Sequence, residues 1–306
     1  MSLTGFLAQR EIRARFRAEF AKPRMAIKKP LVAPPLSRRY ALVGTAFDYL
    51  LRFYLHRRTP NAVHRRWVAE EGLQRLGWES TVVDIDSDDI PSVVEDESYR
   101  AGAAVLTRAR AAHARYIASG TITDSLLRAV VGLAKLDVVY RSGFIDDDLG
   151  GAHTEDIRDL RRLIALVNPR TFRAERRCIL NPVFGKASRL VGGADADFVI
   201  DRTLIDVKTT KTLELRREDF NQLIGYYILH ELSGLEGTKR KGKISKIAIY
   251  FARYAHLESF DMKTIINPST FPQFVRWFVR AARTRRGSAS LQTRRAHSAR
   301  KRERRT

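Results

Sequence analysis

Four residues in one short stretch of the chain are of types that could do chemistry together: Asp195, Asp197, Asp206 and Lys208. Carboxylate oxygens are the ligands that Mg²⁺ prefers in proteins. A lysine beside such an ion can help to activate a water and can stabilise charge on a phosphate. The set therefore predicts metal-dependent hydrolysis of a phosphodiester bond. We expect Asp197 and Asp206 to hold Mg²⁺ or Mn²⁺, and Lys208 to activate the water.

A β-hairpin would bring these side chains together. The apolar runs Phe-Val-Ile and Leu-Ile flank residues 201–202, which are typical of a two-residue turn. In that register Asp197 faces Asp206, and Asp195 faces Lys208. Because side chains alternate along a strand, all four then lie on one face of the sheet. Desolvating three carboxylates on one face is costly, and a divalent cation would offset that cost.

The acidic partner in the first strand has two candidates. Asp197 is favoured because it directly precedes the apolar strand and faces Asp206. Asp195 is the alternative, either as the ligand itself or as a partner of Lys208. An isolated Asp-x-Lys sequence is more often an ordinary solvated strand face. The facing acidic residues are what favour a site.

The order of these motifs resembles that of the PD-(D/E)XK nuclease superfamily, in its RecB-like branch. Asp197, the apolar strand and Asp206-Val207-Lys208 are similar to the core signature, and Gln222 with Tyr226 resembles the Q-x-x-x-Y motif. Residues i and i+4 share one face of a helix. The resemblance implies that Gln222 and Tyr226 lie beside the metal and arrange the lysine and the substrate.

A third match is Gly44 with Asp48, at the start of the first core helix. RecB-like enzymes often have G-x-x-x-H there, with the histidine as a metal ligand, so the resemblance implies that Asp48 is a third ligand. The alternative is an ordinary first-turn residue that the helix dipole favours. Other members of the superfamily use a helix glutamate, for which Glu155 and Glu175 are the candidates.

The elements needed to position these residues follow from hydrophobic periodicity. Helices are predicted near 47–55, 63–76, 98–118, 124–141, 154–167, 217–232 and 271–283, and strands near 177–180, 197–208 and 244–254. This order predicts an α/β fold with a central mixed β-sheet flanked by helices. The resemblance implies a restriction-endonuclease-like core over residues 39–284, with a helical insertion at 60–150.

The net charge of +22 is concentrated at the two ends of the chain. Residues 1–39 hold ten Lys/Arg and two Glu, and residues 281–306 hold ten Lys/Arg and one Glu. We therefore expect a basic N-terminal arm over 1–38, a basic disordered tail over 285–306, and nucleic acid, most simply DNA, as the partner. A membrane partner is not expected, because the C-terminal segment has almost no large apolar residues.

Several classes are disfavoured by composition. The single cysteine, Cys178, leaves no pair for an internal disulfide, and the seven histidines show no close ligand spacing for zinc. The sequence has no secretory signal pattern and no apolar run long enough to span a bilayer, so a cytoplasmic protein is expected. Two alternatives to the nuclease stay open: a catalytically weak nucleic-acid-binding protein on the same fold, and a structural protein whose basic ends contact a polyanion such as the ribosome.

Overall fold

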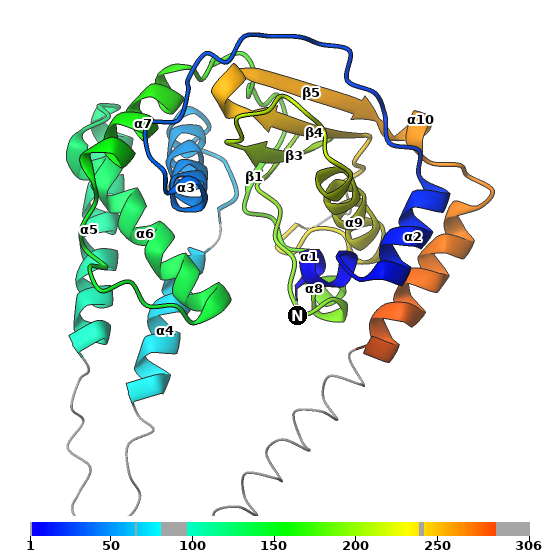
Figure 1. The fold of residues 1–306 in the computed structure, drawn as a ribbon, viewed down its shortest axis with the longest axis horizontal. Coiled ribbons are helices and arrows are strands. Elements are labelled where there is room, and N and C mark those ends of the chain that lie inside the picture. Colours follow the sequence, from blue (N-terminus) through cyan, green and yellow to red (C-terminus); the bar gives the residue numbers. More distant parts are fainter. Residues whose placement is uncertain (1, 65, 81–96, 239–241, 286–306) are drawn as a thin grey trace, which may run out of the picture.

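The computed structural model describes residues 2–64, 66–80, 97–238 and 242–285, and a five-stranded sheet forms its centre (Figure 1). The strands follow one another across the sheet in chain order: β1 (Cys178–Leu180), β2 (Phe198–Ile200), β3 (Thr203–Lys208), β4 (Lys246–Phe251) and β5 (His256–Asp261). Neighbours are antiparallel except β3 and β4, which are parallel. A parallel pair needs a crossover, which α9 (Arg217–Ser233) supplies. The predicted α/β class with a mixed sheet is confirmed.

The β2–β3 hairpin has the predicted register. Ile200 pairs with Thr203 across the two-residue turn. Asp201 in that turn has φ +51°, a left-handed conformation that aspartate tolerates better than most residues. Its carboxylate accepts three backbone N–H groups from residues 175–177, at 3.1, 2.8 and 3.0 Å. These bonds fix the tip of the hairpin, and with it the register of the residues farther along β3.

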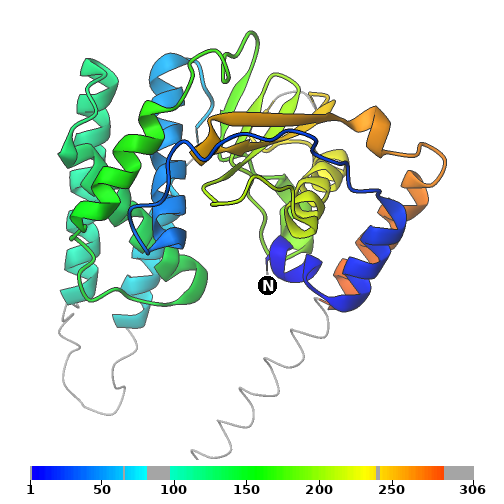
Figure 2. The same ribbon diagram turned by 45° about the horizontal axis from the view of Figure 1, so that its top comes forward.

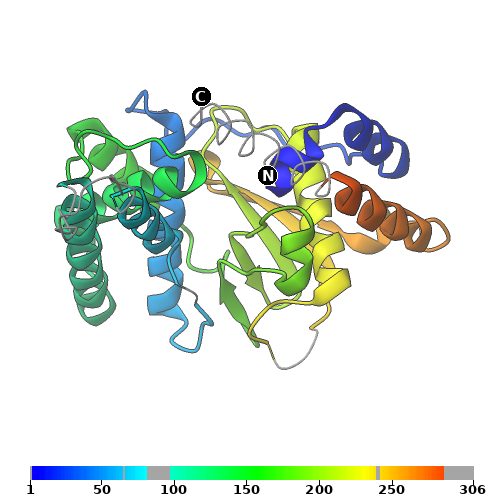
Figure 3. The ribbon, with the colours of Figure 1, turned by 90° about the horizontal axis from the view of Figure 1, so that it is seen from below.

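Helices cover both faces of the sheet (Figures 1 and 3). One layer comprises α3 (Tyr40–Arg58), α4 (Val68–Ser80), α5 (Glu97–Ser119), α6 (Asp124–Ser142) and α7 (Thr154–Ala165). The other comprises α1 (Leu3–Leu7), α2 (Arg10–Glu19), α8 (Gly185–Leu190), α9 and a C-terminal helix over residues 271–285. Alternation along β3 supplies both cores, because Ile205 packs into the first layer and Leu204 into the second. A 3₁₀ turn (Ala252–Tyr254) and α10 (Met262–Ile265) follow β4 and β5.

The N-terminal segment, predicted as an arm over 1–38, is in fact part of the folded domain. Phe6 and Phe16 are fully buried. Phe16 packs edge-on against Phe274 of the C-terminal helix, with ring centroids 5.1 Å apart, and Phe6 packs against Phe278 at 5.3 Å. Figure 2 shows α1 and α2 beside this helix. The basic character of the segment belongs to the outer faces of helices whose inner faces enter the core.

Two further expectations concern the ends and the membrane. The tail predicted over 285–306 lies, apart from Arg285, outside the described residues. Within the described ranges, none of the helices combines the length and the apolar character that crossing a membrane requires.

Candidate active site

Asp206 and Lys208 lie on the same side of β3, at its C-terminal end, where α9 packs against it. Asp206 is 3% exposed, and its Oδ2 lies 2.7 Å from Lys208 Nζ. From α9, Asp219 Oδ1 lies 3.7 Å from the same Nζ, and Gln222 Oε1 accepts a hydrogen bond from it at 3.4 Å. Lys208 is therefore shared between its own strand and the crossover helix.

The Gln222–Tyr226 pair continues this chain of contacts along one face of α9. Gln222 Nε2 donates to the Tyr226 hydroxyl oxygen at 2.8 Å. Burial raises the pKa of Tyr226 well above its usual value, and the carboxylates of Asp195, Asp206 and Asp197 raise it further. The phenol therefore stays neutral, and its O–H finds no acceptor among the residues that the structure describes. It is free to donate to a water or to a phosphate oxygen.

Asp197 approaches Asp206 from the end of β2. Its Oδ2 accepts the backbone N–H of Val207 at 2.6 Å, so the carboxylate lies against the neighbouring strand. Burial raises the pKa of Asp197 to about 7, and the charge of Asp206 adds to the effect, against the opposing charges of Lys208 and Arg52. The two carboxylates predicted to face each other are therefore close enough to resist ionising together.

Lys208 keeps its proton in this environment. Burial alone would lower the pKa of Lys208, but the carboxylates of Asp206 and Asp219 outweigh it and raise the pKa above the usual value. Burial also raises the pKa of Asp206, and the charge of Lys208 partly offsets this rise. An ammonium group donates hydrogen bonds but accepts no proton, so Lys208 can orient a water or hold a phosphate oxygen.

Helix α3 meets the end of β3 at Gly44. A Cβ atom at Gly44 would lie only 3.0 Å from Thr209 Oγ1, so the missing side chain allows close approach. One turn later, Asp48 forms a two-pronged ion pair with Arg52, whose Nε donates to Asp48 Oδ1 at 3.1 Å. Arg52 is buried, and its charge interacts most strongly with Asp197. Asp48 thus belongs to the site's surroundings, with its charge balanced by Arg52.

Asp195 is held by a side chain from α6. Arg141 Nη2 donates to Asp195 Oδ2 at 3.1 Å, and Arg141 also pairs with Asp137 one turn earlier on α6. Asp137 accepts the hydroxyl of Tyr49 at 3.2 Å, which links α6 to α3. Asp195 therefore has Arg141 as its partner, and Lys208 is paired elsewhere. Arg141, which lies within the region predicted as an insertion at 60–150, thus contacts one of the candidate site residues.

The network contains six carboxyl groups and four cationic groups, so full ionisation would leave two negative charges in excess: Asp48, Asp137, Asp195, Asp197, Asp206 and Asp219 against Arg52, Arg141, Lys208 and Arg216. The Oδ2 atom of Asp206 is buried and, despite its ion pair with Lys208, receives no aligned hydrogen bond. Oxygen donors that carry such an excess when ionised are chemically suited to one divalent cation. Across the described residues, however, no three His, Cys, Asp or Glu side chains converge closely enough to hold a metal by themselves.

Two predicted alternatives are not brought into the site. Glu155 is exposed in the first turn of α7. Glu175 is exposed and donates its backbone N–H to Asp201, at the hairpin tip, which is the opposite end of β3 from Lys208. Neither glutamate is therefore placed to act with Asp206.

Five charged residues that complete the network were not predicted: Arg52, Asp137, Arg141, Arg216 and Asp219. A signal for two of their pairings was present in the sequence. Asp48 with Arg52, and Asp137 with Arg141, repeat the spacing Asp-x-x-x-Arg on two otherwise apolar helices. Charged i,i+4 pairs on a helix face that must be buried point to a polar cluster in the interior.

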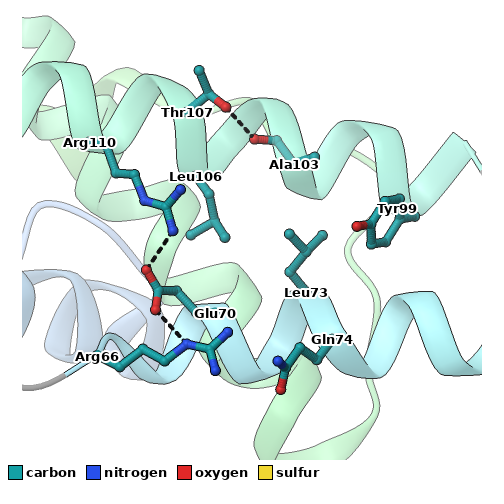
Figure 4. A pocket seen from close by; sticks show the side chains of 9 residues that line it. All are labelled: Arg66, Glu70, Leu73, Gln74, Tyr99, Ala103, Leu106, Thr107 and Arg110. Atoms are coloured by element: carbon teal, nitrogen blue, oxygen red, sulfur yellow. Dashed lines mark hydrogen bonds and ion pairs between the residues drawn. The ribbon is translucent and has the colours of Figure 1, made fainter.

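A separate pocket of about 330 Å³ lies between α4 and α5 (Figure 4). It is lined by Arg66, Glu70, Leu73, Gln74, Tyr99, Ala103, Leu106, Thr107 and Arg110. Glu70 is held between two arginines, at 2.7 Å from Arg66 Nε and 2.8 Å from Arg110 Nη2. The polar groups of this pocket satisfy one another, and its residues take no part in the β3 network.

Three histidines that are distant in sequence pack together between α3 and α5. The His56 and His113 rings are hydrogen-bonded at 3.3 Å, and His64 lies 4.6 Å from His56 by ring centroids. Burial lowers the pKa of His113 to about 4, with the neighbouring histidines adding to the effect. His113 therefore stays neutral at physiological pH and packs as an aromatic ring.

The chain matches no protein-family model, and no curated protein and no solved structure shows significant similarity to it.

Proposed function

We propose that this protein is a metal-dependent nuclease that hydrolyses DNA phosphodiester bonds, built on a restriction-endonuclease-like core of the PD-(D/E)XK type. The observation that carries the proposal is the pairing of Asp197 and Asp206 at the end of a β-hairpin, with Lys208 on the same face. The hydrogen bonds from Lys208 to Gln222 and from Gln222 to Tyr226 support the proposal, because they link that face of the sheet to the crossover helix α9.

Asp206 and Asp197 are the residues that would hold Mg²⁺ or Mn²⁺, with Asp48 as the nearest further carboxylate on α3. The ion would supply positive charge for an attacking water and for the phosphate oxygens. Lys208, held as an ammonium group, would orient the water and stabilise the phosphate. Gln222 keeps Lys208 in place, and the Tyr226 hydroxyl is available as a second donor.

One observation favours a second candidate, a nucleic-acid-binding protein with weak or no catalysis. The candidate ligands already have protein cations beside them, since Lys208 pairs with Asp206 and Arg52 pairs with Asp48. A site neutralised from within binds a divalent cation less strongly, because the cation must compete with ammonium and guanidinium groups. The arginine-rich outer faces of α2 and the C-terminal helix would suit either function.

The two functions are distinguished by cleavage of labelled single- and double-stranded DNA in Mg²⁺, Mn²⁺ or EDTA. We expect cutting that requires the metal, and loss of cutting in Asp206→Asn and in Lys208→Met. Asp124→Asn is a matched control: Asp124 is an exposed carboxylate at the far end of α6, about 25 Å along the helix from Arg141. This control should cut like the wild type.

Full activity in Lys208→Met would contradict the assignment of the site. If the wild type cuts in none of these metals but binds DNA tightly, the protein is the binding protein instead. Circular dichroism and thermal unfolding of each variant ensure that lost activity is not lost structure.

A further inference from the structure

Helix α2 and the C-terminal helix form one unit on the outside of the α9 layer. Helix α2 and the C-terminal helix run antiparallel: Glu11 pairs with Arg285 at 2.8 Å, and the Glu19 carboxylate at the other end accepts the Thr270 hydroxyl. The Phe16–Phe274 contact lies between these two ends. Figures 1 and 2 show the two helices side by side.

The outer faces of these two helices are rich in arginine. Eight arginines stand against only two glutamates: Arg10, Arg13, Arg15, Arg17, Arg276, Arg280, Arg283 and Arg285 against Glu11 and Glu19. Three of the eight are paired with carboxylates, since Arg13 approaches Glu218, Arg15 pairs with Glu19, and Arg285 pairs with Glu11.

The other five arginines have no carboxylate partner among the described residues, and all five are exposed: Arg10, Arg17, Arg276, Arg280 and Arg283. On the C-terminal helix, Arg276, Arg280 and Arg283 follow the spacing i, i+4, i+7, which places them along one stripe about 10 Å long. Because the helix backbone is already rigid, binding to a regular array of negative charges orders only the arginine side chains.

We propose that this two-helix surface binds the sugar–phosphate backbone of a DNA duplex. A duplex carries one negative charge per about 1.7 Å of axis, so a 10 Å stripe of arginines spans several phosphates. The proposal takes DNA as the polyanion from the proposed function. Binding itself requires neither the metal nor the β3 network.

The chemistry of the surface favours a duplex over a single strand. Proteins that hold single strands usually stack the bases on exposed aromatic rings. The aromatic side chains of α2 and the C-terminal helix point into the core or are partly covered, and the guanidinium of Arg15 lies over the Trp277 ring at 5.9 Å. Neither helix contributes to the strongly exposed large apolar residues of the described chain.

A lipid surface fits less well. An amphipathic helix binds a membrane by inserting its apolar face. The apolar face of α2 is already used inside the protein, where Ile12 and Phe16 are at most 2% exposed. What remains outside is charge without an apolar anchor.

The test compares two double variants that each remove two charges at i,i+4 positions of an exposed helix face. Arg276→Gln/Arg280→Gln alters the proposed surface, and Arg158→Gln/Arg162→Gln on α7 is the matched control. Substitution is preferable to deletion, because α2 and the C-terminal helix also build the core. Binding of full-length chains to a labelled 20-base-pair duplex is measured in EDTA, between 50 and 300 mM salt, by fluorescence anisotropy.

We expect the salt slope, log K against log [salt], to become shallower by about 1.8 in the surface variant. At 0.1 M salt its affinity should fall on the order of 10- to 60-fold. The control should stay within about threefold of the wild type. Adding Arg10→Gln and Arg17→Gln to the surface variant should roughly double the change in slope.

Three results would overturn the proposal. Equal losses in both double variants would mean that only net charge matters, and unchanged binding in the surface variant would mean that other residues bind DNA. The surface would belong to another ligand if Arg276→Gln/Arg280→Gln weakened binding to single-stranded DNA, or to phosphatidylserine vesicles, more than it weakened binding to the duplex. Because EDTA prevents metal-dependent cutting, these outcomes do not depend on whether the protein is a nuclease.

Discussion

The buried ion pair between Arg253 and Asp159 gives the sharpest prediction for stability. Both side chains are fully buried, and they form a two-pronged pair at 2.8 and 2.9 Å between the end of β4 and α7. Arg253 also donates to the carbonyl oxygens of Thr209 at 2.7 Å and of Ala33 at 3.1 Å. One guanidinium therefore ties the sheet to α7, to the end of β3 and to the N-terminal connection.

We expect Arg253→Met to lower the free energy of unfolding by about 5 kcal/mol. Leaving the Asp159 carboxylate buried without its partner costs about 3–5 kcal/mol. The two abandoned carbonyl oxygens add roughly 1 kcal/mol each. For a chain of this size the loss corresponds to a fall in Tm of about 8 °C.

Urea unfolding of the wild type, Arg253→Met and the double variant Arg253→Met/Asp159→Leu tests this reasoning. The double variant removes the buried charge but not the two unmet carbonyls, so it should recover about 3 kcal/mol of the loss. A single variant that costs less than about 2 kcal/mol, or a double variant no more stable than the single, would refute the argument that the unpaired carboxylate dominates.

Three further predictions concern the close contact at Gly72, the titration of His113 and the hydroxyl of Tyr226. Gly72→Ala should destabilise by about 1–3 kcal/mol in urea unfolding, because the new Cβ would lie 2.0 Å from the Leu136 carbonyl oxygen; an unchanged midpoint would mean that no close contact exists there. The pKa of His113 is lowered to about 4 in the folded protein, so the unfolded chain binds more protons and stability should fall as pH drops from about 6.5 to 4. Because the ring is partly exposed, the loss should be on the order of 1–2 kcal/mol, and unfolding of His113→Phe should depend less on pH than the wild type. Tyr226→Phe should reduce DNA cleavage roughly 10- to 100-fold. Its free energy of unfolding should stay within about 1 kcal/mol of the wild-type value, because only the hydroxyl that accepts a hydrogen bond from Gln222 is lost. Normal cleavage by this variant would mean that the hydroxyl takes no part in the reaction.

The sequence was sufficient for the parts of the site that depend on local geometry. A two-residue turn fixes the register of a hairpin, so the positions of Asp197 and Asp206 followed from the turn alone. The contact between Gln222 and Tyr226 likewise follows from the i,i+4 spacing of a helix. Neither inference needed knowledge of how distant helices pack.

The rest of the site depends on that packing. Arg141 reaches Asp195 only because α6 lies beside the end of the sheet, which no local pattern in the sequence indicates. The N-terminal helices were missed for a different reason: a high density of arginine concealed an apolar face at Phe6 and Phe16. Strand β5 was not predicted either. It lies at an edge of the sheet and carries polar residues, so it lacks the regular apolar alternation that indicates a strand.

The pairing of α2 with the C-terminal helix also has a consequence for synthesis. During synthesis, residues 3–20 leave the ribosome long before Phe274 and Phe278, the phenylalanines that pack against them. The helical bundle around α6 makes mostly nearer contacts and can form while translation continues. The second core must wait, with apolar surface exposed, until residues 274–278 have emerged. This protein should therefore fold in two stages, and a stop codon before residue 274 should yield an aggregating product instead of a shortened folded protein.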